Sequence, residues 1–216
     1  MTTNSVRPQA AGVIAIVVSY QPDWERLTEL LEAVASQTES VVVVDNGSNQ
    51  DVGSSIAALG DARLHIFPLG QNLGIGAAHN AGIRWARERG AKYVLLMDQD
   101  SMPDPGMVAK LQSAQEKLVA EGKKVAAVGP RFRDSDSGRL SQHVRFGKVS
   151  IARVNCLPGQ QVVMTDFLIS SGSLISADTL DAVGEMDEGL FIDQVDTEWV
   201  LRARAKGYMA WGHCEA

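Results

Sequence analysis

The first half of the chain alternates between continuous apolar runs and segments whose apolar residues recur every three or four positions. Continuous runs are typical of strands covered on both faces of a parallel sheet. They occur at residues 12–20, 40–45, 63–67, 92–97 and 124–130. The periodic segments predict amphipathic helices. They occupy residues 23–36, 54–59, 75–89 and 107–120. The alternation predicts an α/β fold with a mainly parallel, Rossmann-like sheet and helices on both faces.

The second half of the chain has a weaker pattern. Charged turns separate short apolar stretches between residues 131 and 163, which indicates a small antiparallel excursion or flexible loops. The elements expected after it are a strand over 166–176, a helix over 178–184, a helix over 196–207 and a strand over 208–212. Gly184 is expected to end the first of these helices. Asp196 is a candidate cap for the second, whose core-facing residues are predicted to be Val200, Leu201 and Ala205.

Composition narrows the class of protein. The chain has 216 residues, 45% of them hydrophobic, which suffices for one large α/β domain or two small ones. The net charge of −6 gives no basic field for nucleic acid. Cys156 and Cys214 are far apart in sequence, so we expect no disulfide framework and a reducing, cytoplasmic compartment. No apolar run approaches the roughly 20 residues that span a bilayer, and residues 1–11 are expected to form a flexible tail.

Candidate chemistry gathers where the predicted strands end. In parallel α/β sheets, ligands bind beyond the carboxyl ends of the strands. The polar residues at these ends include Ser19, Tyr20, Asp45, Asn46, Asn72, Asp98 and Asp100. The pair Asp98 and Asp100 is either a solvated turn or a site for a hard divalent cation, whose coordination shell a diphosphate would complete. The position of the pair after a buried strand favours the cation.

Two other segments have alternative interpretations. Gly74 and Gly76 precede a helix, so their amides could face an anion. A dinucleotide-binding fingerprint would need a third glycine where His79 stands, which makes a nicotinamide-dependent oxidoreductase a weak alternative. Asp193, Asp196 and Glu198 crowd the start of the helix over 196–207. They either cap the helix or supply a general base.

Six segments together resemble a known family. They are "VVSYQPDWERLTELLEAVASQ", "VVVVDNGSNQ", "LGQNLGIGAAHNAGIRWA", "YVLLMDQDSMP", "DFLISSGSLIS" and "FIDQVDTEWVLRARAKGY". In this order, from about residue 13 to 212, the chain resembles the family-2 inverting nucleotide-sugar glycosyltransferases of the GT-A fold. Within that family it is similar to the bacterial rhamnosyltransferases of surface-polysaccharide synthesis.

The resemblance implies a role for each candidate residue. Donor-binding residues would be Ser19, Tyr20, Asp45, Asn72, Gly74 and Asp98, with Asn80 supporting the loop that contains Asn72. Asp98 and Asp100 would hold Mn²⁺ or Mg²⁺, with Asp100 favoured as the direct ligand. Asp196 would be the catalytic base, and Asp193 is the second choice because the spacing of acids differs from the commoner family form.

The resemblance also implies partners and a domain organisation. The donor would be dTDP-rhamnose or a UDP-sugar, and the acceptor a saccharide or a lipid-linked saccharide. We expect peripheral membrane association at most, at the inner face of the plasma membrane. Residues 12–128 would form the nucleotide-sugar-binding half, and residues 129–216 a partial acceptor-side half that is truncated at its C-terminus. The alternative is a nucleotide-binding module without transfer activity, and the sequence leaves the oligomeric state open.

Overall fold

The computed structural model describes residues 10–133, 138–147 and 149–216. Its strands are β1 (Ala10–Ser19), β2 (Thr38–Asp45), β3 (Leu64–Pro68), β4 (Tyr93–Asp98), β5 (Val125–Gly129), β6 (His143–Phe146), β7 (Ile151–Val154), β8 (Val162–Thr165), β9 (Ser173–Ser176) and β10 (Met209–His213). Its helices are α1 (Trp24–Ala35), α2 (Val52–Ala58), α3 (Ile75–Glu88), α4 (Met107–Ala120), α5 (Ala177–Val183), the short 3₁₀ helix η1 (Glu188–Leu190) and α6 (Val195–Ala205). The α/β class and mainly parallel sheet predicted from the sequence are confirmed.

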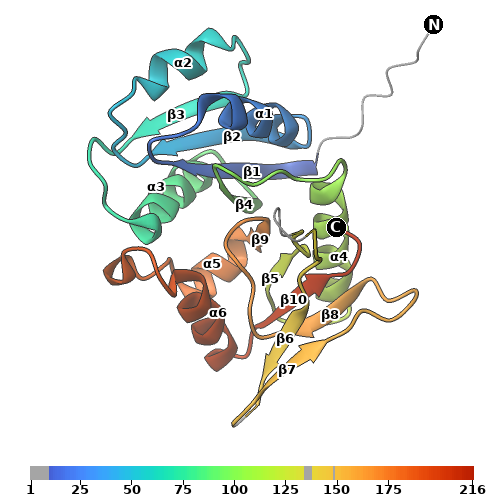
Figure 1. The fold of residues 1–216 in the computed structure, drawn as a ribbon. Coiled ribbons are helices and arrows are strands. Elements are labelled where there is room, and N and C mark those ends of the chain that lie inside the picture. Colours follow the sequence, from blue (N-terminus) through green and yellow to red (C-terminus); the bar gives the residue numbers. More distant parts are fainter. Residues whose placement is uncertain (1–9, 134–137, 148) are drawn as a thin grey trace, which may run out of the picture.

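The sheet has eight strands in the order β3-β2-β1-β4-β9-β5-β10-β8 (Figure 1). The block β3-β2-β1-β4 is parallel, and β10 is parallel to β5. Because β9 runs antiparallel to both β4 and β5, these two strands point the same way and end at the same sheet edge. The register places Ser19 opposite Asp45 and Val18 opposite Asp98, so the polar strand ends meet as predicted.

Helices cover both faces of the sheet, and alternate residues of one strand face opposite cores. Ile14, Ile16 and Val18 of β1 pack in the cluster that includes residues of α3, α5 and α6. The residues between them pack with α1, α2 and α4. Figure 1 shows these two groups of helices on either side of the sheet. Burial on both faces explains why the strands read as continuous apolar runs rather than as alternating ones.

Two predicted elements differ from the structure. The strand expected over 166–176 is present only as β9, because Gly172 has a φ of +85° and a Cβ there would lie 2.6 Å from Pro130. Helix α6 begins after Gln194, so Asp196 lies in its first turn instead of capping it. Of the residues expected to face the core, Val200 is buried while Leu201 and Ala205 are exposed.

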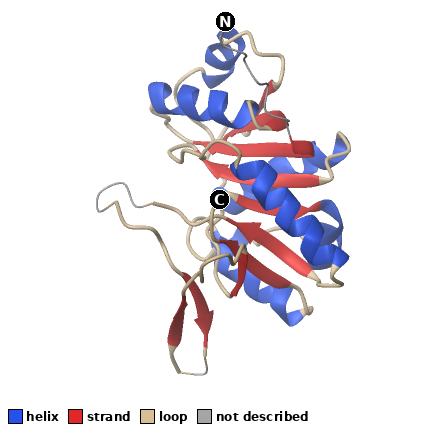
Figure 2. Cartoon of the chain, turned by 90° about the vertical axis from the view of Figure 1, so that its right-hand side faces the viewer, coloured by secondary structure: helices blue, strands red, loops and turns tan. Residues whose placement is uncertain are grey.

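The antiparallel excursion is a hairpin of β6 and β7 that projects from the body of the molecule (Figure 2). One buried carboxylate anchors it. Oδ2 of Asp166 accepts hydrogen bonds from Arg145 Nε at 2.9 Å and from the amide of Phe146 at 2.8 Å. Arg204 of α6 lies 3.1 Å from the other carboxylate oxygen. Arg145 and Arg204 together neutralise a carboxylate that could not otherwise be buried cheaply.

The expectation that the two cysteines stay unpaired is wrong. Cys156 and Cys214 form a disulfide whose Cα atoms lie 5.8 Å apart. The bond links the segment between β7 and β8 to the residue that follows β10. Distance in sequence concealed the pairing, because β8 and β10 are neighbours in the sheet and bring the two residues together.

The expected tail, residues 1–11, lies largely outside the described residues, although Ala10 and Ala11 already belong to β1. No helix within the described ranges combines the length and apolar character needed to cross a bilayer. The division of the chain at residue 128 stays a prediction.

Candidate functional site

A cavity of about 490 Å³ opens at the carboxyl edge of the sheet. It is lined by Val18, Tyr20, Asn46, Asn72, Gly74, Ile75, Asp98, Gln99, Asp100, Ile169, Ser170, Phe191, Ile192, Val195 and Asp196. These residues come from the ends of β1, β2 and β4, from the loop before α3, and from two segments of the second half of the chain. Residues that the sequence analysis grouped only by topology therefore do share one site.

Three carboxylates converge on this cavity. Burial, together with the nearby charges of Asp100 and Asp196, raises the pKa of Asp98 to about 6. Asp98 is the last residue of β4 and Asp100 follows it, whereas Asp196 comes from α6 almost a hundred residues later. Like charges held together in a partly buried cavity are unfavourable unless a cation or a proton compensates them.

Asn46 and Asn72 hold the loop before α3 against the end of β2. Asn46 donates from Nδ2 to Asn72 Oδ1 at 3.0 Å, and it accepts from the amide of Leu73 at 2.9 Å. Asn72 Oδ1 also accepts from the amide of Gly74. The sequence analysis placed Asn46 at a strand end but gave it no role, and its position after Asp45 was the only signal.

Gln99, the central residue of the D-x-D triplet, ties β4 to β1. Its side-chain amide accepts from the backbone amide of Tyr20 at 2.8 Å and donates to the Tyr20 carbonyl at 3.1 Å. These two bonds imitate a further step of strand pairing beyond the sheet. They fix Tyr20 and the triplet relative to one another, and no sequence pattern predicts this role for Gln99.

Gly74 and Gly76, at the start of α3, contact another segment of the chain. The amide of Ile75 donates to the carbonyl of Phe191 at 2.6 Å. A Cβ on Gly74, whose φ is +88°, would lie 2.4 Å from that carbonyl oxygen, and a Cβ on Gly76 would lie 2.9 Å from the carbonyl oxygen of Asp187. The segment 187–191 therefore occupies the space beside Gly74 and Gly76 where an anion could otherwise bind. This further weakens the interpretation of these glycines as part of a dinucleotide-binding fingerprint.

The segment between β8 and β9 closes the cavity beside the triplet. The hydroxyl of Ser171 accepts from the amide of Asp98 at 3.1 Å and donates to the hydroxyl of Ser101 at 2.7 Å. Ile169 and Ser170 line the cavity directly. The sequence analysis assigned these residues to a strand and missed their place in the site.

Backbone strain marks the rim of the cavity. Within the described residues, the non-glycine residues with positive φ are Gln21 (47°), Phe191 (30°) and Gln194 (68°). Phe191 lines the cavity, Gln21 follows Tyr20, and Gln194 precedes Val195. Such conformations are costly and persist at functional sites where the surrounding structure fixes them.

Four residues for which the sequence predicts a role are not among those that line the cavity. Ser19 and Asp45 are buried behind the lining, and Asp45 accepts from the amide of Ser48. Asp193 is exposed and does not line the cavity. Asn80 does not support the loop that contains Asn72: it exchanges hydrogen bonds with the backbone of Met186 and donates to Glu188.

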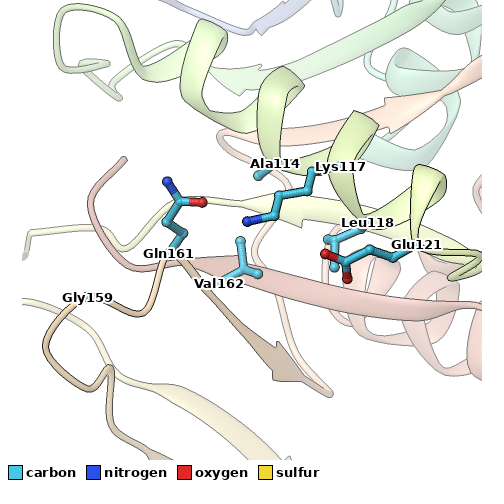
Figure 3. Close-up of a pocket in the computed structure, with 7 residues that line it drawn as sticks. All are labelled: Ala114, Lys117, Leu118, Glu121, Gly159, Gln161 and Val162. Atoms are coloured by element: carbon cyan, nitrogen blue, oxygen red, sulfur yellow. The ribbon is translucent and has the colours of Figure 1, made fainter.

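Another cavity, of about 380 Å³, lies between α4 and the start of β8 (Figure 3). Lys117 and Glu121 extend from α4 beside Gln161 and Val162. It shares no lining residue with the cavity that holds the three carboxylates, and it contains no paired acids. The chemistry therefore concentrates in the cavity at the carboxyl edge of the sheet.

The fold places the chain in a class, the α/β proteins of the GT-A type, with an acid-lined cavity at the carboxyl edge of the sheet. Solved structures support the fold. The chain superposes on GalNAc-T7, whose crystal structure contains UDP, GalNAc and Mn²⁺, with a TM-score of 0.72 at 14% identity, covering 94% of this chain and 43% of that one. It superposes on TarS of S. aureus with a TM-score of 0.66 at 16% identity, covering 94% and 35%.

The chain belongs to glycosyl transferase family 2, whose family model matches residues 14–175. It is 34% identical to the dTDP-rhamnosyl transferase RfbF of Shigella flexneri over 200 residues, covering 92% of this chain and 65% of the relative. It is 30% identical to the galactofuranosyltransferase GlfT1 of Mycobacterium tuberculosis over 214 residues, covering 94% and 67%. The chain thus spans about two thirds of the length of these relatives.

A third relative is the N-acetylglucosaminyl-diphospho-decaprenol L-rhamnosyltransferase of Mycobacterium tuberculosis. The identity is 29% over 136 residues, covering 57% of this chain and 41% of the relative. Family membership, expected from the six segments, is confirmed.

Proposed function

We propose that the protein transfers a sugar from a nucleoside-diphosphate donor to a saccharide or lipid-linked acceptor in surface-polysaccharide synthesis. Rhamnose from dTDP-rhamnose is the favoured sugar, and the sugar of a UDP-sugar donor is the alternative. The convergence of Asp98, Asp100 and Asp196 on one cavity carries this proposal. Two acids stand at the end of β4, where a diphosphate and its cation would bind, and a third stands on α6. The rhamnosyltransferase relatives support the choice of sugar.

The reaction is a single in-line displacement with inversion. Asp196 accepts the proton of an acceptor hydroxyl while that oxygen attacks the anomeric carbon, and the bond from this carbon to the diphosphate breaks. Oδ1 of Asp196 accepts from the amide of Thr197 at 2.7 Å, which orients the carboxylate. Tyr20, held by Gln99, and the linked pair Asn46 and Asn72 position the nucleotide.

Asp98 and Asp100 would hold Mn²⁺ or Mg²⁺. The raised pKa of Asp98 fits this role, because a cation would neutralise the repulsion among the three acids. The described residues contain no group of three or more His, Cys, Asp or Glu at metal-binding spacing, so donor phosphates and water would complete the shell. A bound cation would neutralise charge on the departing diphosphate.

Ligand-induced stabilisation tests the donor. The chain is heated with dTDP-rhamnose, UDP-glucose or NAD, each with Mn²⁺ or with EDTA. We expect dTDP-rhamnose with Mn²⁺ to raise the melting temperature most, because a ligand that binds the native state stabilises it. Stabilisation by NAD alone would contradict the proposal.

The role of Asp196 is tested by substitution. Asp196→Asn should abolish rhamnose transfer and leave donor affinity within about twofold, because the amide keeps the size of the side chain but accepts no proton. Asp193→Asn is the matched control, since Asp193 is exposed outside the cavity, and it should retain activity. The reverse pattern would make Asp193 the base. Donor binding without transfer in the unmodified chain would support the non-catalytic nucleotide-binding module.

A further inference from the structure

A second groove, of about 700 Å³, begins where β5 ends. Residues after β5, the start of β6, part of β7 and residues 167–169 form it. Since β4 and β5 are parallel, the groove and the donor cavity lie at the same edge of the sheet. Ile169 lines both, so the two hollows lie next to one another.

The groove is positively charged in a chain whose net charge is −6. Arg131, Arg139 and Arg153 line it, and no Asp or Glu is among its described lining residues. Within the part of the chain that the structure describes, neither Arg131 nor Arg153 forms an ion pair. The nearby carboxylate of Asp166 is already shared by Arg145 and Arg204. Arginines that no described carboxylate of the groove neutralises are suited to phosphate groups.

Apolar and neutral polar side chains stand beside these arginines. Phe132 and Leu140 line the groove and are 45% and 43% exposed, so they present apolar surface beside the arginines. Ser141 and Gln142 supply hydroxyl and amide groups. Nε of Arg131 donates to the carbonyl of Ser141 at 2.8 Å, which holds this guanidinium at the wall of the groove. The lining therefore suits a molecule that joins a phosphate to an apolar chain.

We propose that this groove binds the phosphate-bearing, lipid-linked end of the sugar acceptor. Arg131 and Arg153 contact its phosphate or diphosphate, and Phe132 and Leu140 pack against the start of the lipid. The saccharide then passes Ile169 into the donor cavity, where its hydroxyl meets Asp196. This inference rests on the proposed transfer reaction and narrows its acceptor to saccharides carried on a lipid phosphate.

Titration with geranyl diphosphate tests the groove separately from the donor cavity. Measurements in EDTA remove the cation that the donor cavity needs for a diphosphate. We expect geranyl diphosphate to bind without displacement by dTDP, and to bind more weakly as salt rises. Geraniol, which lacks the charge, should not bind measurably. Equal affinity for inorganic diphosphate would indicate a free-anion site and overturn the assignment to a lipid-linked acceptor.

Substitutions locate the binding. Arg153 is exposed, so Arg153→Ala should fold normally and weaken geranyl diphosphate binding by about five- to tenfold. Arg131→Lys, which keeps the charge but loses the two-pronged geometry, should weaken it less than Arg131→Ala. Lys123→Ala is the control: it also removes an exposed charge, but from the turn before β5 at the opposite edge of the sheet. Unchanged affinity in both Arg153→Ala and Arg131→Ala would refute the proposal.

A variant in the donor cavity separates this inference from the proposed function. Asp100→Ala should lose Mn²⁺-dependent nucleotide binding while it keeps geranyl diphosphate binding. Arg153→Ala should do the opposite. If no nucleotide binds the unmodified chain, the proposed function fails. If nucleotide binds and the Arg131→Ala and Arg153→Ala variants bind geranyl diphosphate as tightly as the unmodified chain, only the assignment of the groove fails.

Discussion

Acid should destabilise the protein through His79. This side chain, on α3, is fully buried, and neither of its ring nitrogens has a hydrogen-bond partner among the described residues. Burial lowers its pKa from 6.5 to about 4. At a pH between these two values, His79 is therefore largely protonated in the unfolded chain and largely neutral in the folded chain.

The sign and size of the effect follow from proton linkage. The free energy of unfolding falls as pH drops below 6.5, and this decline ends near pH 4, where the folded histidine also becomes charged. The full loss is about 3 kcal/mol, and roughly half of it is reached by pH 5.5. Asp98 acts in the opposite direction, because its pKa is raised to about 6 in the folded state. The contribution of His79 must therefore be measured as a difference between variants.

His79→Leu isolates that contribution. Urea unfolding, followed by tryptophan fluorescence, is measured for the variant and the unmodified chain at pH 7, 5.5 and 4.5. We expect the two to differ by less than about 1 kcal/mol at pH 7, since leucine fills a similar volume without unpaired nitrogens. The variant should become the more stable of the two as pH falls. His65→Leu, a partly exposed control beside Trp85, should follow the unmodified chain. A parallel pH dependence in His79→Leu would refute the reasoning.

Three further predictions concern the site and the disulfide. Asp98→Asn should raise the free energy of unfolding of the cation-free chain by about 2 to 3 kcal/mol at pH 7. The gain should be smaller at pH 5, because Asp98 is already largely protonated there. Urea unfolding in EDTA measures both values. The same variant should lose Mn²⁺-dependent nucleotide binding by calorimetry. Gln99→Ala should weaken dTDP binding by about fivefold, because alanine removes both hydrogen bonds to Tyr20. Gln99→Glu should have an intermediate affinity, because glutamate can still accept the hydrogen bond from the Tyr20 amide. Equal dTDP affinity in the unmodified chain and both variants would exclude a positioning role for Gln99. Reducing the disulfide between Cys156 and Cys214, which are 58 residues apart, should lower the free energy of unfolding by about 4 kcal/mol. The stability of the chain with both Cys156→Ser and Cys214→Ser should not change when reductant is added.

The sequence predicted what local burial determines. A strand covered on both faces is apolar along most of its length, so continuous apolar runs predicted β1, β2 and β4. The acids Asp98 and Asp100 could be identified as candidate site residues because they occur where one of these runs ends. The parallel topology then implied that these ends meet. A helix end that depends on one residue was also predictable, since Gly184, expected to end the helix over 178–184, is the C-cap of α5.

Features that depend on distant contacts could not be predicted. The segment 166–172 has the composition of a strand, but its conformation depends on Gly172 lying against Pro130. Gly74 gives the same local signal whether an anion or another part of the chain approaches it, and here the Phe191 carbonyl does so. Which acid of the region 193–198 reaches the cavity depends on where α6 begins, and the αL conformation of Gln194 sets that start.

Asp166 links the two halves of the proposed reaction. Its carboxylate is fully buried, so it is stable there only while both arginines remain paired with it. Arg145 belongs to the hairpin whose strands form part of the basic groove, and Arg204 belongs to α6, whose first turn contains Asp196. A movement that separated the groove from α6 would therefore leave a buried charge without a partner. The protein thus holds the proposed acceptor groove and the proposed base Asp196 at a fixed separation. The proposed displacement requires this, because the acceptor hydroxyl and the base must meet at the anomeric carbon of the donor.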